Sequence, residues 1–223
     1  MREVLRERNR RGEGGRLRAD ILAGATELLE QAGSEEAVTL RAVARQVGIS
    51  APSIYTHFAD REAIVEAIVD SAFADFNGAI NAAVEAGSGP LARLRAGCAA
   101  YLRFAAERPN RYKLLFERQM LPEPVDGQAA RDGPAASDGP AGPDCPVSAI
   151  RTESFYALVK CLQDCVDAGI SASTDAHVDS VAIWVALHGY ATLRAPMSGF
   201  PWPDTDVLLD RIIDGLGQIT RHD

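Results

Sequence analysis

A short helix, a tight turn at a glycine and a second short helix follow one another within residues 39–64, and this stretch constrains the fold more than any other. Apolar residues recur at helical spacing from Leu40 to Val47, and Gly48 follows where a left-handed residue usually ends a helix. Pro52 stands in the first turn of the next predicted helix, where its missing N–H costs nothing. This layout is typical of a helix-turn-helix, whose second helix enters the major groove of DNA.

The second helix, predicted at about Ala51–His57, is too short to be stable alone and needs apolar anchors. We expect Ile54 and Phe58 to pack inward, which leaves small or hydrogen-bonding side chains free to approach bases and phosphates. Thr39 is expected to cap the first helix, Ser50 the second, and Asp60 the longer helix that follows. The candidate DNA-contacting residues are Thr39, Arg41, Ser50, Ala51, Ser53, Tyr55, His57 and Arg61.

Some of these residues also have a purely structural interpretation. Tyr55 could pack against a neighbouring ring, and His57 could be a solvated histidine at a helix end. Within the whole pattern we favour DNA contact for Tyr55 and Ser53, whereas both interpretations of His57 stay open. Arg41 is a better candidate for phosphate contact than Arg45, which lies one turn further along.

The segment from about Gly15 to Asp75 resembles the DNA-binding domain of TetR-type transcriptional regulators. The matching pieces are ILAGA at 21–25, Leu28-Leu29, Gly33, TLRAVA at 39–44, VGIS at 47–50, SIYTHF at 53–58 and REAI at 61–64. They are specific in combination. At Arg61 the family more often has Lys, and both can contact a phosphate. The resemblance implies an all-α fold: an N-terminal three-helix helix-turn-helix DNA-binding domain followed by a helical ligand-binding and dimerisation domain.

We therefore expect three parts: an arm over 1–14, the DNA-binding domain over 15–75, and the effector-binding and dimerisation domain over 76–223. The first sixteen residues hold six Arg and three Glu, which predicts a disordered basic arm, either inert or reaching a minor groove. Residues 122–146 hold six of the twelve Pro and four Gly, which predicts a disordered loop.

Charge is unevenly distributed along the chain. The formal net charge is −8, but residues 1–61 carry 10 Arg against 9 acidic residues, so the acidic excess belongs to the remainder. Attraction to phosphate is therefore expected to be local to the first part of the chain. The sequence shows no signal-peptide pattern and no apolar run of about 18 residues, so we expect a cytoplasmic protein without a membrane span.

The four cysteines are Cys98, Cys145, Cys161 and Cys165. Cys161 and Cys165 lie one turn apart on a predicted helix, where buried core thiols are expected more often than a thiol sensor or metal clip. Cys145 lies in the predicted loop and is the candidate for oxidation. No His/Cys cluster has zinc spacing, and no nucleophile–base pair or glycine-rich phosphate loop is visible. We expect no enzyme activity, no cofactor and no metal.

The apolar surfaces of two predicted C-terminal helices indicate that the protein has a partner. Residues 176–195 are apolar on nearly all faces, and Val207–Ile219 carries a second apolar stripe. A soluble helix of the first kind must be covered on every side, by its own domain or by a partner. We expect a homodimer through a two-fold four-helix interface, which also suits two DNA half-sites.

Trp184, His188 and Gly189 resemble a Trp-His-Gly signature in the C-terminal domain of one TetR subgroup, whose members are inferred to sense small molecules. Trp184 and His188 could line such a pocket, or could be a packed Trp with a satisfied core His, and both interpretations stay open. The acidic body weakly favours a neutral or cationic ligand. The candidate pocket residues are Phe73, Phe76, Tyr101, Phe104, Tyr112, Phe116, Phe155, Trp184 and His188.

These patterns predict a ligand-responsive DNA-binding regulator that binds a palindromic operator in double-stranded DNA as a homodimer. Repression as its output is what the resemblance implies. The alternative is a helical protein-interaction module that uses the helix-turn-helix as a scaffold.

Overall fold

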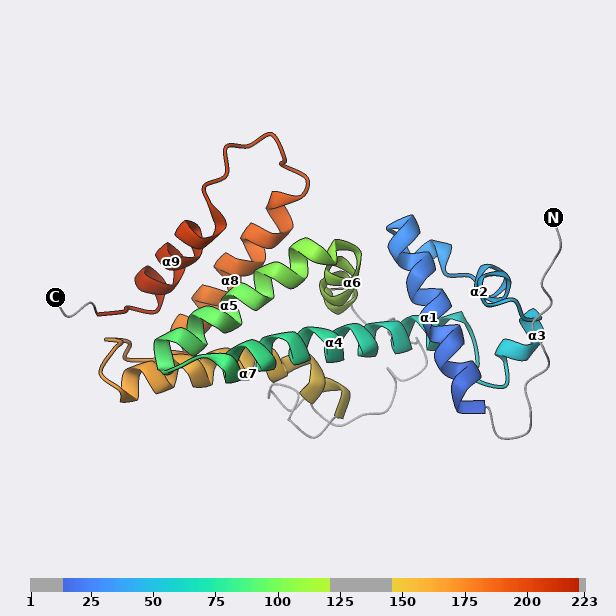
Figure 1. Cartoon of the computed structure of the whole chain (residues 1–223), viewed down its shortest axis with the longest axis horizontal. Coiled ribbons are helices and arrows are strands. Elements are labelled where there is room, and N and C mark those ends of the chain that lie inside the picture. Colours follow the sequence, from blue (N-terminus) through green and yellow to red (C-terminus); the bar gives the residue numbers. More distant parts are fainter. Residues whose placement is uncertain (1–13, 121–145, 221–223) are drawn as a thin grey trace, which may run out of the picture. The chain divides into compact units, whose positions relative to one another are not determined.

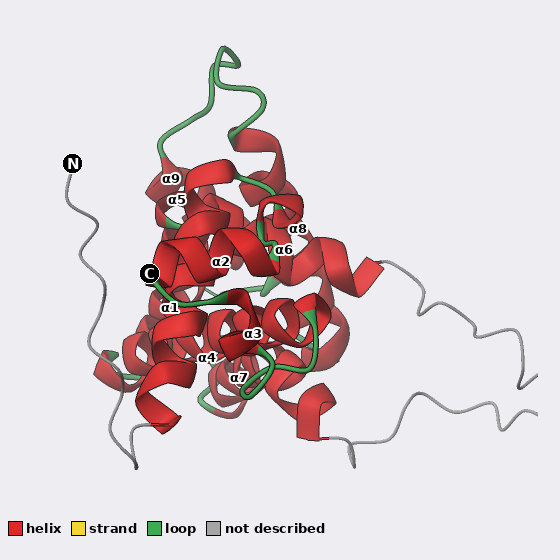
Figure 2. Cartoon of the chain, turned by 90° about the vertical axis from the view of Figure 1, so that its right-hand side faces the viewer, coloured by secondary structure: helices red, strands yellow, loops and turns green. Residues whose placement is uncertain are grey.

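The computed structural model describes residues 14–120 and 146–220, with side chains placed over 15–116 and 152–220. Every regular element within these ranges is a helix, as Figure 2 shows, and the all-α fold class is confirmed. The predicted arm over 1–14 and the predicted loop over 122–146, with Cys145, fall almost entirely outside the described residues.

The described residues form two units. The first unit comprises residues 14–72 and 110–115. Its elements are α1 (Gly14–Ala32), the 3-10 helix η1 (Glu35–Ala37), α2 (Leu40–Val47), α3 (Ala51–Ile54), the first part of α4 (Arg61–Ala86) and a segment of α6 (Pro109–Met120). Its core is made by apolar side chains with little or no exposure: Ile21, Ala25, Leu29, Val38, Val43, Ile54, Ile64 and Ile68.

A glycine allows α1 and α2 of the first unit to approach closely. A Cβ atom at Gly24 would stand 2.7 Å from Cγ2 of Val47, closer than real Cβ contacts allow. A side chain at this position would therefore require Val47 or the two helices to shift, and the contact explains a glycine in the interior of α1, where it lowers helix propensity.

The second unit comprises the described residues of 73–109 and 116–220. Its helices are the remainder of α4, α5 (Pro90–Glu107), the end of α6, α7 (Pro146–Asp167), α8 (Ala176–Arg194) and α9 (Thr205–Leu216). Helix α5 packs against α7, α8 and α9, and α8 packs against both α7 and α9 (Figure 1). The centre of this core is made by Phe73, Phe76, Leu94, Leu162, Ile183, Leu187 and Ile213.

Helix α8 is less covered than its composition predicts. Its N-terminus is capped by Asp175, whose carboxylate accepts from two backbone N–H groups. Ile183 and Leu187 are buried, whereas Val178 and Val185 are more than half exposed. No helix within the described residues is long and apolar enough to cross a membrane.

The last helix ends earlier than the predicted Val207–Ile219. Helix α9 stops at Leu216, and Gln218 adopts a left-handed conformation with φ of 49°. Ile219 then forms an isolated antiparallel bridge with Ser171, whose hydroxyl donates to the Gly217 carbonyl over 2.7 Å. Ile219 is thus part of a hydrogen-bonded contact between the α7–α8 connection and the segment after α9.

Candidate functional site

The turn between α2 and α3 has the predicted geometry. Thr39 caps α2, because its hydroxyl oxygen accepts from the Ala42 N–H over 3.2 Å. Gly48 has φ of 75°, the left-handed conformation that favours glycine. The Ile49 N–H donates to the Ala44 carbonyl over 2.9 Å, which closes the turn. Both the Thr39 cap and the Gly48 helix end are confirmed.

Helix α3 is held by two apolar anchors, as the sequence predicts. Ile54 is fully buried and Phe58 is 4% exposed, with the Arg18 guanidinium 4.7 Å above the Phe58 ring centroid. Helix α3 itself ends at Ile54, not at His57. The His57 and Phe58 N–H groups both donate to the Ile54 carbonyl, so the chain tightens there and turns Phe58 into the core.

Ser50 stands at the N-cap position of α3, as predicted, but its side chain makes no capping hydrogen bond. Its hydroxyl instead lies 2.7 Å from the Ser53 hydroxyl, and the Thr56 hydroxyl donates to the Ser53 carbonyl over 2.8 Å. The Asp60 cap is confirmed, since its carboxylate accepts from the Ala63 N–H over 2.8 Å.

The candidate DNA-contacting side chains differ in exposure. Tyr55, at the end of α3, is 59% exposed although it stands between two buried anchors in sequence. Exposed candidates are Thr39, Arg41, Ser50 and Tyr55, and half-buried ones are Ala51, Ser53, His57 and Arg61. The polar side chains thus lie on the outer side of the buried apolar anchors, where a DNA duplex can reach them.

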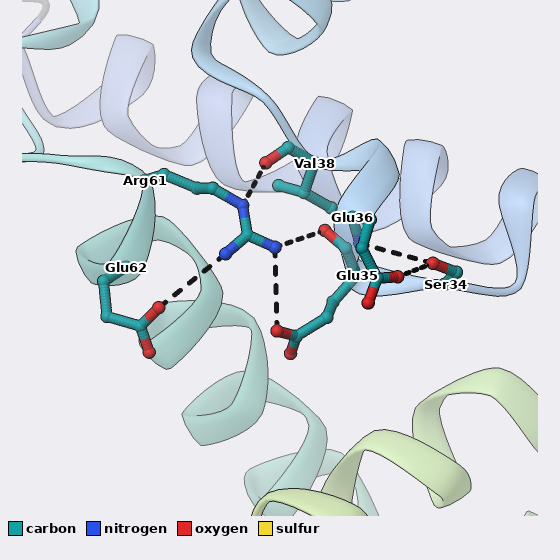
Figure 3. A network of polar contacts seen from close by, with 6 residues as sticks. All are labelled: Ser34, Glu35, Glu36, Val38, Arg61 and Glu62. Carbon is teal, nitrogen blue, oxygen red and sulfur yellow. Dashed lines mark hydrogen bonds and ion pairs between the residues drawn. The ribbon is translucent and has the colours of Figure 1, made fainter. Parts of the chain in front are cut away.

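Arg61 is engaged inside the first unit (Figure 3). Its Nε donates to the Val38 carbonyl over 2.9 Å, and its Nη2 donates to the Glu35 carbonyl over 2.6 Å. The guanidinium also forms ion pairs with the carboxylates of Glu35 at 3.6 Å and Glu62 at 3.8 Å. The sequence suggests phosphate contact for Arg61, whereas the structure makes it a link between the start of α4 and η1.

A cavity of about 360 Å³ lies among α4, α5, α7 and α8 of the second unit. Its wall includes an aromatic cluster in which the Phe76 ring meets the Tyr101 ring edge to face, with 5.2 Å between centroids. Six predicted pocket residues line it: Phe73, Phe76, Tyr101, Phe116, Phe155 and Trp184. These side chains come from five different helices, and only the folded unit brings them together.

The structure places the three other predicted pocket residues outside this lining. Phe104 is buried against Phe76, with 5.1 Å between ring centroids, and Tyr112 is buried in the first unit. His188 lies one layer behind the wall, where its Nδ1 is 3.3 Å from the Tyr101 hydroxyl and its ring centroid is 4.6 Å from that of Phe116. Burial lowers the pKa of His188 below its ordinary value of 6.5.

Sequence reasoning missed five polar or sulfur-bearing lining residues: Cys98, Thr152, Ser154, Cys161 and His177. The spacing His177–Val181–Trp184 places three lining residues on one face of α8 and could have found His177. Burial raises the pKa of Cys98 to about 12 and that of Cys161 above its ordinary range, so both stay protonated at neutral pH. Within the described residues, no group of three or more His, Cys, Asp or Glu could hold a metal ion.

Helices α8 and α9 of the second unit expose large apolar side chains. Gly189 on α8 has open space around its Cα, where an added Cβ would meet nothing within 4 Å. The exposed large side chains on the two helices are Val178, Val181, Val185, Leu193, Val207 and Leu216. Val178, Val181 and Val185 recur at helical spacing and share one face of α8, and an exposed apolar face of this kind is typical of a protein interface.

Two family models match the chain. One described as "Bacterial regulatory proteins, tetR family" matches residues 21–68, and one described as "Tetracyclin repressor-like, C-terminal domain" matches residues 94–216, more than half of the chain. The chain belongs to the TetR family. TetR-family proteins are ligand-responsive DNA-binding transcription regulators and are generally not enzymes.

Solved structures have the same TetR-family architecture. A protein with unknown function from Rhodococcus sp. RHA1 is 26% identical, with 94% of this chain and 97% of that chain covered and a TM-score of 0.72. The TetR family transcriptional regulator PfmR from Thermus thermophilus is 21% identical, with 88% of this chain and 98% of that chain covered and a TM-score of 0.62.

AibR, solved in complex with isovaleryl coenzyme A and operator DNA, is 16% identical, with 91% of this chain and 99% of that chain covered and a TM-score of 0.59. The likeness to PfmR and AibR shows the shared fold. No curated protein matches the chain.

Proposed function

We propose that this protein is a ligand-responsive repressor that binds a palindromic operator as a homodimer and releases it when a small molecule enters the cavity of the second unit. The observation that carries the proposal is the exposed polar face of α3, with Tyr55 59% exposed, over the buried anchors Ile54 and Phe58. A helix of four residues has no other means of stability than this anchoring, and its outward side chains are those that can reach base edges.

The DNA contacts divide into two kinds. Ser53, Tyr55 and His57 project from α3 or its end and are assigned to base edges and their surroundings. Thr39 and Arg41 stand at the start of α2, where an exposed hydroxyl and guanidinium suit phosphate oxygens. This second group supplies affinity and register without sequence information.

Dimerisation follows from the exposed apolar patch on α8 and α9. The patch carries Val178, Val185 and Val207, each more than half exposed. A two-fold axis would bury the same patch of both copies against each other as a four-helix interface. A dimer also presents two α3 helices to two half-sites, about 34–36 Å apart for successive major grooves.

Two helices are suited to transmit ligand binding. Helix α4 begins at Arg61 in the first unit and lines the cavity further along with Phe73 and Phe76. In α6, Asn110 and Arg111 belong to the first unit, and Phe116 lines the cavity. A ligand that displaces these aromatic side chains would shift both helices and change the spacing of the half-site readers, with a coupling free energy of about 1–3 kcal/mol.

The α6 segment is bound firmly to α1. Asn110 Nδ2 donates to the Glu30 carbonyl over 2.9 Å, and Arg111 Nε forms an ion pair with the Glu30 carboxylate at 2.8 Å. Movement of α6 would therefore be passed to α1. AibR was solved with both a small molecule and operator DNA, which supports the proposal that a protein of this fold can bind both.

The test is selection of duplexes from a random DNA library by the purified protein, followed by sequencing. We expect an inverted repeat whose half-sites are one or more helical turns apart. Enrichment of a single half-site would contradict the dimer, and no enrichment at low salt would contradict operator binding by the free protein. Isolation of the corresponding promoter and a reporter assay then separate repression from activation.

A further inference from the structure

We propose that the cavity of the second unit selects an uncharged, compact ligand with an aromatic or alicyclic ring, and rejects carboxylates, phosphates and ammonium ions. This inference rests on the proposed function only in taking the cavity as the effector site. It adds the chemical class of the ligand, which follows from the side chains of the wall.

Among the described residues that line the cavity, none is Asp, Glu, Lys or Arg. The wall is made of aromatic rings, aliphatic side chains and two thiols, with polar atoms from Tyr101, Thr152, Ser154, His177 and Trp184. A ligand that enters this cavity therefore exchanges water for hydrocarbon and neutral hydrogen-bonding groups. An ion would lose its hydration without gaining a partner of opposite charge, which is costly.

Three titratable groups in or behind the wall, Cys98, Cys161 and His188, are kept neutral at pH 7 by burial. Cys98 is buried and its pKa is raised to about 12, and burial raises the pKa of Cys161. Burial lowers the pKa of His188 below 6.5, so its imidazole is neutral where it meets the Tyr101 hydroxyl. Protonated thiols are poor nucleophiles, so the wall favours reversible binding over covalent capture.

The carboxylate adjacent in sequence to the lining is bound elsewhere. Glu153 stands between Thr152 and Ser154, and its two carboxylate oxygens accept from Asn77 Nδ2 at 3.2 Å and Asn81 Nδ2 at 2.9 Å. The two amides belong to successive turns of α4. Glu153 thus joins α7 to α4 and leaves the cavity without its charge.

The shape of the wall favours a ring. Phe76 meets Tyr101 edge to face, and Phe155 and Trp184 meet at 72° with 6.3 Å between centroids. A flat ligand gains both apolar burial and edge or face contacts with such rings. The volume of about 360 Å³ is near the lower end of the range for small-molecule sites, which favours a compact ligand over a long phosphorylated one such as a coenzyme A ester.

The experiment is isothermal titration calorimetry of the full chain with three probes that share one ring system: 2-naphthamide, 2-naphthoate and 2-naphthylmethylammonium. We expect the amide to bind at least about 10-fold more tightly than either ion, because only the ions suffer unpaired desolvation. Equal or tighter binding of an ion would overturn the proposal, and so would failure of all three probes to bind.

Two pairs of variants locate the binding. Ala157→Phe fills the cavity and is expected to abolish binding of the amide, whereas Tyr156→Phe, on an exposed neighbour in α7, is expected to leave it unchanged. Thr152→Arg introduces a cation at an exposed part of the lining and is expected to reverse the preference toward 2-naphthoate, whereas Thr152→Gln is not. Amide binding that survives Ala157→Phe would overturn the assignment to this cavity.

Operator affinity measured with saturating 2-naphthamide separates this inference from the proposed function. If the amide binds in the cavity and operator affinity does not change, the ligand response of the proposed function fails for this probe while the chemical class of the cavity stands. If operator selection succeeds and no probe binds, the proposed operator binding stands and the proposed chemical class of the ligand is overturned.

Discussion

At the scale of single residues, the same amino acid has different roles according to what surrounds it. Tyr55 and Tyr156 are 59% and 61% exposed, yet Tyr55 ends a helix whose neighbours are anchored and Tyr156 lies on a face of α7. Tyr101 is buried and its hydroxyl meets His188. Position in the fold therefore separates a candidate DNA contact, an open surface position and a residue of the cavity wall.

Tyr55→Ala is expected to weaken operator binding by about 10-fold or more, because a lost contact in the groove costs roughly 1–3 kcal/mol. Fluorescence anisotropy with the selected operator measures the loss. Tyr156→Ala, which removes an equally exposed tyrosine from the second unit, is the control and should bind like the wild type. Equal affinities of the two variants would remove Tyr55 from the interface.

His188 makes stability depend on pH. Its folded pKa is lowered by burial, so the unfolded chain takes up a proton more readily once the pH falls below about 6.5. Its stabilising contribution is therefore fully present above that pH and is lost below it. Between about pH 7.5 and 5.5, the Tm of the wild type should fall further than that of His188→Gln. The exposed His177, changed to Gln, is the control, and the same fall in His188→Gln as in wild type would contradict the assignment.

At the scale of elements, helices are joined by few but specific contacts. In the first unit, Arg61 ties the start of α4 to η1 through two backbone carbonyls, and Gly24 lets α2 approach α1. Each contact depends on the shape of one side chain, or on its absence. Each contact can be tested by a single substitution paired with a matched control at an exposed position.

Arg61→Lys is expected to lower the free energy of unfolding by about 1 kcal/mol, because an ammonium group cannot donate to both the Val38 and the Glu35 carbonyl in the geometry of a guanidinium. Chemical denaturation measures the change. Arg45→Lys, on the exposed face of α2, is the control. If Arg61 served only to contact phosphate, Arg61→Lys would unfold at the wild-type denaturant concentration.

Gly24→Val is expected to destabilise the protein by about 2 kcal/mol more than Ala23→Val. Both variants place a β-branched residue in α1, but only residue 24 meets Val47. Helix propensity favours Gly24→Val and disfavours Ala23→Val, so a greater loss of stability in Gly24→Val reports the steric contact. Thermal or chemical unfolding compares the pair. Equal stability of the two variants would mean that α1 and α2 separate at little cost.

At the scale of the whole molecule, the proposed homodimer would form through the exposed apolar side chains of α8 and α9. Val185 is 56% exposed near the middle of α8, and burial of such a residue in a two-fold interface places it against the partner. Binding to the proposed operator would depend on this assembly, because one short α3 reads only half of a palindrome.

Val185→Glu is expected to convert the dimer to monomers, since the two-fold axis brings the new carboxylates of both copies into the same apolar interface. Sedimentation velocity measures the assembly, and operator affinity should fall with it. Tyr156→Glu adds the same charge at another exposed position and should remain dimeric. A wild-type protein that sediments as a monomer at micromolar concentration would contradict the dimer itself.

Much of the fold was predictable from local patterns. The all-α class, the Thr39 cap, the left-handed Gly48 and the burial of Ile54 and Phe58 all follow from the spacing of a few neighbouring residues. Local signals failed where two outcomes have the same spacing. Serine is a common capping residue, but the Ser50 hydroxyl contacts the Ser53 hydroxyl and does not cap α3. Phe104 follows Tyr101 by three residues in α5, but it lies outside the cavity lining.

Local patterns in the sequence predict the helices, the glycine end of α2 and the apolar anchors of α3, because hydrogen bonding and apolar periodicity act over a few residues. The partners that these residues meet depend on the packing of the whole chain. Arg61 meets carbonyls 23 and 26 residues earlier, and the cavity collects side chains from five helices, with no Asp, Glu, Lys or Arg among its described lining residues. Such contacts depend on how whole helices pack, and no local pattern in the chain encodes the distance between them.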